Sequence, residues 1–98
     1  MVALNELPAE DFEALVDQDV TLAWESGRLA CRVESVWRSP YPTGRGLPGF
    51  SVFLRGPADK ALNQGIYTLH HAALGELDLF LTPVARDAQG MRYEIVFN

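Results

Sequence analysis

Runs in which apolar and polar residues alternate occupy most of the chain after residue 19. A period of two places successive side chains on opposite faces of an extended strand, so each run predicts a strand with one buried face. The six runs are 20–24, 29–37, 50–55, 65–71, 77–84 and 91–97. Glycine, proline and other turn-forming residues separate them, which predicts an antiparallel sheet with mostly short links.

The run 29–37 shows how side chains are assigned to the two faces. Strict alternation places one set of side chains inside: Leu29, Cys31, Val33, Ser35 and Trp37. The same rule leaves a second set outside: Arg32, Glu34 and Arg38. A Glu-Ser-Gly-Arg segment precedes this run and is a tight-turn signal, so 20–24 and 29–37 are predicted to form a hairpin.

The run 77–84 contains three consecutive apolar residues, Leu79, Phe80 and Leu81. Such continuity is typical of a strand covered on both faces, so this strand is predicted to lie centrally. The segment Arg-Asp-Ala-Gln-Gly that follows predicts a hairpin loop of about four or five residues, with Gly90 in the left-handed conformation.

One short helix is predicted before the strands, over residues 8–16. Pro8 suits a first helical position, and the two acidic residues that follow it interact favourably with the helix dipole. Phe12, Leu15 and Val16 have the spacing of one helix face, which is expected to pack on the sheet. The stretch 58–63 is compatible with one further helical turn.

Residues 39–49 are predicted to be the one long loop, because they hold three prolines and three glycines in eleven residues. The whole chain, 1–98, is then a single domain with a β body over 20–98. The predicted fold is mainly β: about six antiparallel strands that form a small barrel or a rolled two-layer sheet, with a short N-terminal helix. The pattern leaves these two arrangements open.

The net charge of −5 is concentrated at the start of the chain. Residues 1–20 hold six acidic residues and no lysine or arginine, so the remainder is near neutral. A body without a basic field attracts few phosphates, and nucleic acid is not expected as a partner. No apolar stretch approaches the roughly 20 residues that span a bilayer, and no signal-peptide pattern is present, so we expect no membrane partner and a cytoplasmic location.

Few residues suggest chemistry. His70 and His71 are the only histidines, and neighbours in a strand point to opposite faces, so a structural role is expected, with Glu76 or Asp78 bonding one of them. The single cysteine, Cys31, excludes an intrachain disulfide and is expected to be buried and unreactive. The letters G-x-G-x-x-G at 44–49 lack the strand and helix that dinucleotide binding needs. No catalytic residue, metal or cofactor is predicted.

The long loop is the best candidate for an interaction site. Arg38, Tyr41 and Arg45 combine aromatic area with arginine, and both residue types are enriched where proteins bind one another. Trp37 adjoins them and is expected to face the core.

Three segments carry a resemblance to a known family: G-F-S-V-F-L-R-G-P at 49–57, the run 62–84, and Y-E-I-V-F-N at 93–98. They resemble a family of short bacterial proteins classed as a domain of unknown function. That family is similar in its F-S-L-x-F-R-G-P, Q-G-x-Y-x-L-x-H and L-G-x-L-x-L-F-L-x-P runs, and F-E-A-L-V at 12–16 fits as well. Val52 and Leu54 depart from the first run. The resemblance implies no activity, but it suggests a role beside a phage-tail-like assembly, because some members are encoded near phage-tail-collar-like proteins.

These features predict a non-enzymatic protein-interaction or assembly domain, whose edge strands or long loop engage another protein. A homo-oligomer is also compatible with the sequence. The alternative is a small-molecule-binding β-barrel with an apolar mouth near Trp24, Trp37 and Tyr41. A hydrolytic or metal-dependent enzyme that uses His70 or His71 is the least supported hypothesis.

Overall fold

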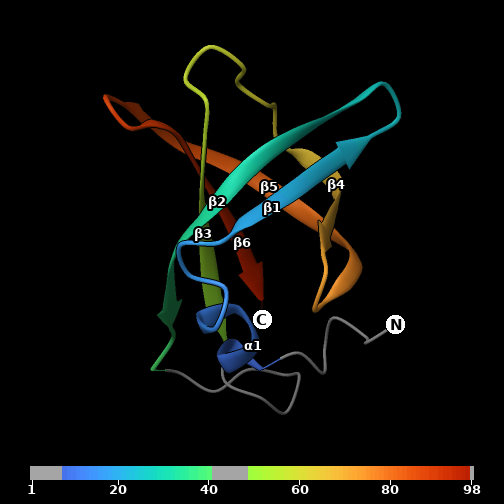
Figure 1. Cartoon of the computed structure of the whole chain (residues 1–98). Helices are drawn as coiled ribbons and strands as arrows, with labels where there is room; N and C mark the ends of the chain where they lie inside the picture. The colour runs from blue at the N-terminus through green and yellow to red at the C-terminus, as the bar shows by residue number, and fades with distance from the viewer. Residues whose placement is uncertain (1–7, 41–48, 98) are drawn as a thin grey trace.

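The computed structural model describes residues 8–40 and 49–97 and shows a closed antiparallel β-barrel with a short helix at one end (Figure 1). In chain order the elements of this part are α1 (Ala9–Glu13), β1 (Asp19–Trp24), β2 (Gly27–Arg38), β3 (Phe50–Gly56), β4 (Gly65–His71), β5 (Gly75–Asp87) and β6 (Gly90–Phe97). Around the barrel the strands follow the order β1-β2-β3-β6-β5-β4. The predicted fold class is confirmed, and of the two predicted arrangements the structure has the barrel.

Two long strands, β2 and β5, build the barrel by changing partners along their length. The first half of β2 pairs with β1 and its second half with β3, while β5 pairs first with β4 and then with β6. Figure 1 shows both as long ribbons that cross the molecule. β1 and β4 close the circle through three pairs, Thr21↔His70, Leu22↔Leu69 and Ala23↔Thr68. The expectation that a partner could use free strand edges is therefore wrong, since closure pairs the edges with each other.

The barrel interior is filled by alternating side chains from all six strands of the described chain. The largest side chains without solvent contact there are Leu22, Val33, Val52, Leu54, Leu69, Leu81, Tyr93 and Ile95. The hydroxyl of Tyr93 accepts a hydrogen bond from the Leu62 backbone N–H at 3.0 Å, so the one polar atom of this set has a partner.

Helix α1 covers one end of the barrel. Phe12 is fully buried, and its ring centroid lies 5.0 Å from that of Phe97 and 5.9 Å from that of Phe50. The helix is shorter than the predicted 8–16, because the chain turns after Glu13 and Asp17 adopts a left-handed conformation with φ 71°. The Asp17 N–H then donates to the Val33 carbonyl at 2.8 Å, which ties the helix exit to β2. No helix in the described ranges is long and apolar enough to cross a membrane.

A β-bulge in β2 reverses the predicted faces of the strand beyond Val33. The register shifts between Val33 and Ser35, so Glu34 is an extra residue opposite β3. After the bulge Val36 packs against the core and Trp37 points outward, with 55% of its surface exposed. The prediction that Ser35 and Trp37 face the core is wrong for this reason.

The expectation that β5 is covered on both faces is also wrong. Phe80 lies on the outer face of the barrel and is 53% exposed, while Leu79 and Leu81 on either side of it are buried. No layer of the described chain covers the outside of β5, so three consecutive apolar residues do not indicate a central strand here.

The predicted turns are largely confirmed. The β1–β2 hairpin has a two-residue turn after Trp24, which pairs with Gly27. The β5–β6 hairpin is tighter than predicted, because Asp87 already pairs with Gly90, whose φ is 109°. Residues 58–63 form no helix: 58 and 59 lie in a turn, and 61–63 have no regular structure. Ser39 N–H donates to the Gly49 carbonyl at 2.8 Å and closes the base of the long loop.

Candidate functional site

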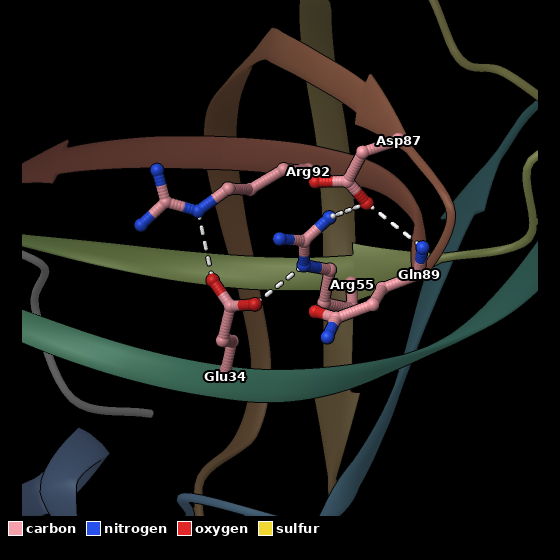
Figure 2. Close-up of polar contacts among 5 residues, drawn as sticks. All are labelled: Glu34, Arg55, Asp87, Gln89 and Arg92. Carbon is pink, nitrogen blue, oxygen red and sulfur yellow. Dashed lines mark hydrogen bonds and ion pairs between the residues drawn. The ribbon is translucent and has the colours of Figure 1, made fainter.

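The β2 bulge places the carboxylate of Glu34 between two arginines of neighbouring strands (Figure 2). Arg92 on β6 donates from Nε to Glu34 Oε1 at 2.8 Å, and Arg55 on β3 donates from Nε to Glu34 Oε2. Arg55 also donates from Nη1 to Asp87 Oδ1 at 2.9 Å, and the same oxygen accepts the Gln89 backbone N–H at 2.8 Å. The cluster therefore links β2, β3 and the β5–β6 hairpin.

The strand register explains why these carboxylates are needed. Arg55 lies directly opposite Arg32 on one side and Arg92 on the other. Like charges in opposite positions of a sheet destabilise it. The carboxylates of Glu34 and Asp87 relieve that repulsion for Arg55 and Arg92.

The electrostatics of the cluster make it unsuited to acid–base catalysis near neutral pH. Burial acts to raise the pKa of Glu34, but hydrogen bonds from Arg55 and Arg92 outweigh it and lower that pKa below its ordinary value. The backbone N–H of Gln89 and the Arg55 guanidinium lower the pKa of Asp87. A general acid or base works best with a pKa near the working pH, and these carboxylates stay ionised. The cluster is better suited to holding strands in place.

An apolar surface lies beside this cluster on the outside of β2, β3 and β6. Trp37 pairs with Ser51, which pairs with Val96, so three side chains form one row. Trp37 is 55% exposed and Val96 53%, whereas Ser51 between them is only 4% exposed. The guanidinium carbon of Arg92 lies 3.9 Å from the ring centroid of Phe53, farther along β3. We call Trp37, Ser51, Phe53, Arg92 and Val96 the Trp37 surface.

The loop residues named from the sequence lie differently. The Arg38 side chain is partly exposed, and its guanidinium also contacts two carboxylates of α1. Arg38 Nη2 lies 2.5 Å from Glu13 Oε1 and 3.2 Å from Glu10 Oε1. The hydrogen bonds with Glu13 raise the pKa of Arg38. Tyr41, Arg45 and all but the last glycine of the G-x-G-x-x-G segment lie outside the described residues. Their role in an interaction stays a prediction.

Sequence reasoning missed the bulge and with it most of the Trp37 surface. A signal was present, since apolar residues occur at 29, 31 and 33 and then at 36, a shift of one position. Glu34 and Ser35 supply two polar residues in succession at the point of the shift. The ion cluster has no comparable signal, because Glu34 and Arg92 are 58 positions apart.

The two histidines bind different partners, as expected for adjacent strand residues. His70 Nδ1 lies 3.3 Å from Glu76 Oε1, so one of the two predicted carboxylates does lie beside a histidine. His71 Nε2 lies 3.0 Å from Gln18 Oε1, and its Nδ1 accepts the Ala73 N–H. Within 8–40 and 49–97, no three His, Cys, Asp or Glu side chains gather as metal ligands would.

Cys31 lies inside the barrel wall, as predicted, and is buried. Burial raises the pKa of its thiol to about 11. A thiol that stays protonated at neutral pH is a poor nucleophile and a poor metal ligand.

Trp24 and Trp37 do not come together to form the apolar mouth that was predicted for a small-molecule carrier. Trp24 pairs with the first residue of β2, and Trp37 lies near the last. Trp24 packs edge-on against Tyr67, with 5.7 Å between the ring centroids. Trp24, on β1, therefore lies beside one end of β2, and Trp37 lies at the other end.

The geometry defines a class: a small, closed, six-stranded antiparallel barrel with a helix over one end and an ion cluster on its wall, in the described part of the chain. The chain belongs to the family described as "Domain of unknown function (DUF6916)", whose model matches residues 7–97. Neither the curated proteins nor the solved structures contain a match.

Proposed function

We propose that this protein is a non-enzymatic interaction domain and that the Trp37 surface is where it contacts another protein. The observation that carries the proposal is the outward turn of Trp37, which a bulge produces and an ion cluster stabilises. An exposed leucine or valine alone is common on protein surfaces, but an exposed tryptophan in the same cross-strand row as a second exposed apolar residue favours a contact site.

The composition of the surface supports the same conclusion. Trp37 and Val96 supply apolar area, and Arg92 supplies a planar cation that rests on the Phe53 ring. Tryptophan and arginine are among the residues that contribute most to binding energy in protein interfaces. The long loop, with Arg38, Tyr41 and Arg45, begins at the same end of β2.

Rigid support is a further argument. The carboxylate of Glu34 is hydrogen-bonded to both Arg55 and Arg92, and these residues belong to the three strands that carry the Trp37 surface. A surface on paired strands loses little conformational freedom when it binds. The barrel thus holds the backbone of Trp37 in place through pairing with β3.

The interior of the barrel does not favour the carrier alternative. Side chains from every strand occupy it, and Tyr93, Leu22 and Leu54 are fully buried there. We therefore place the binding function on the outside of the barrel. Two narrower forms of the proposal rest on the sequence. The resemblance suggests a position beside a phage-tail-like assembly of a bacterial host, and the sequence composition suggests a cytoplasmic location.

The proposal is tested by affinity capture from the native host followed by quantitative mass spectrometry. Immobilised wild-type protein is compared with Trp37→Ser, and Glu25→Gln is the control because Glu25 is exposed in the β1–β2 turn, at the opposite end of β2 from Trp37. We expect at least one protein to be captured by the wild type and the control but not by Trp37→Ser. Equal capture by Trp37→Ser would refute the assignment, as would recovery of no protein together with a strict monomer by light scattering.

A further inference from the structure

A second exposed surface lies on the β4–β5 hairpin. Its outward side chains form three cross-strand pairs: His70↔Glu76, Thr68↔Asp78 and Ile66↔Phe80. Ile66 is 66% exposed and Phe80 is 53% exposed. They lie directly opposite each other on β4 and β5 and so form an exposed apolar cross-strand pair. We call these six residues the hairpin surface.

The hairpin surface carries two carboxylates, Glu76 and Asp78. The sequence has no lysine or arginine between Ala61 and Ala85. Asp78 accepts a hydrogen bond from the Thr68 hydroxyl at 2.6 Å, and Glu76 meets the His70 ring at 3.3 Å. Neither carboxylate has an arginine or lysine partner within the described ranges.

Four carboxylates elsewhere in the described chain bind arginine. Glu10 and Glu13 bind Arg38, while Glu34 and Asp87 bind Arg55. Ionised carboxylates beside an exposed aromatic ring attract a cation from outside the molecule. The hairpin surface thus combines an apolar pair with two carboxylates that form no ion pair with an arginine or lysine of residues 8–40 and 49–97.

We propose that the hairpin surface docks a second protein whose contact region has an apolar side chain flanked by lysine or arginine. Phe80, Asp78 and Glu76 follow one another at every second position of β5, so their Cα atoms are spaced by about 7 Å. The partner accordingly places its cations about 7 and 14 Å from the residue that covers Phe80.

A second copy of this chain is a poor occupant. It has a net charge of −5, which opposes self-association. Three of its arginines, Arg38, Arg55 and Arg92, bind carboxylates of their own chain and are less available to a neighbour. The hairpin surface is built from β4 and β5, whereas the Trp37 surface is built from β2, β3 and β6. Each of the two proposals can therefore be refuted without affecting the other.

The test uses a random peptide library displayed on phage and panned on the full-length protein. Peptides that also bind Phe80→Ser are removed, and the remainder are synthesised and titrated by fluorescence anisotropy. We expect an aromatic or aliphatic residue flanked by lysine or arginine in the selected peptides. Phe80→Ser should weaken their binding on the order of tenfold or more, and Asp78→Asn roughly fivefold, because an exposed ion pair contributes less than a buried apolar contact.

Two controls isolate the surface. Asp59→Asn removes an exposed carboxylate from the β3–β4 connection and should leave affinity unchanged, and Trp37→Ser should do the same. Circular dichroism melting confirms that every variant is folded. The proposal is overturned if no peptide depends on Phe80, if the selected peptides are acidic or neutral, or if affinity does not fall with added salt. It is also overturned if light scattering shows a dimer that Phe80→Ser dissociates.

Discussion

Glu34 Oε1 accepts a hydrogen bond from Arg92 Nε at 2.8 Å, across 58 positions of sequence. The contact exists because Glu34 is the extra residue of a bulge in β2 and its carboxylate reaches both Arg55 and Arg92. The same bulge turns Trp37 to the outside of the barrel. One extra residue in a strand thus creates both the ion cluster and the surface that we propose for binding.

Replacing Glu34 by glutamine should lower the stability of the barrel in a pH-dependent way. Since the folded-state pKa of Glu34 lies below its ordinary value of 4.5, its stabilising effect is fully present above that value and is lost as pH falls through the folded-state pKa. At pH 7 we expect Glu34→Gln to reduce the free energy of unfolding by about 1 kcal/mol. Urea titrations at a series of pH values measure the difference.

Glu94→Gln is the matched control, because Glu94 lies on the same face of β6 next to this cluster but has no part in it. It should leave the urea midpoint nearly unchanged. A Glu34→Gln difference that persists undiminished at pH 3 would contradict the assigned role.

Alanine at Gly90 should disrupt the β5–β6 hairpin. Gly90 has φ 109°, and a Cβ there would lie 2.1 Å from the Gly56 carbonyl oxygen of β3. Gly75 also has positive φ, 76°, but a Cβ there meets nothing within 4 Å. We expect Gly75→Ala to cost about 1 kcal/mol of stability from backbone strain and Gly90→Ala to cost clearly more, because the backbone must also move. Thermal melts of the two variants compare them, and equal melting temperatures would show that the Gly56 contact is unimportant.

Removing the Tyr93 hydroxyl should destabilise the protein without changing the shape of the core. The ring is fully buried, and its hydroxyl accepts the Leu62 N–H at 3.0 Å. Tyr93→Phe leaves that N–H without its partner, for an expected loss of about 1 kcal/mol. Tyr67→Phe serves as the control, since its hydroxyl donates to the Asn63 carbonyl at an exposed position. Urea midpoints that rank the two variants in the opposite order would argue against the prediction.

Cys31 should react slowly in the folded protein. Burial raises the pKa of the thiol to about 11, so the thiolate population at pH 8 is more than about a hundredfold smaller than that of a free cysteine. Reaction with Ellman's reagent at this pH, with and without guanidinium chloride, measures the effect. Rapid reaction without denaturant would mean that the thiol is accessible or activated.

The sequence alone was sufficient to determine the strands, most turns and the antiparallel class. These features are local: alternation identifies a strand, and Glu25-Ser26-Gly27 or Gly90 identifies a turn. Burial of Phe12 in α1, of Leu15 in the turn that follows it and of Cys31 in β2 agrees with the same periodicities. The family membership was also accessible, because the motifs at 49–57 and 62–84 are written in the sequence.

Tertiary structure decided closure and the composition of the outer surface. Closure depends on three pairs between β1 and β4, whose residues are more than forty positions apart, and no local pattern specifies them. The outward position of Trp37 depends on a bulge whose register is defined only against β3. The exposure of Phe80 depends on the lack of a covering layer over β5 in the described chain. Periodicity reports which side chains share a face, but only the assembled barrel determines which of those faces meet solvent.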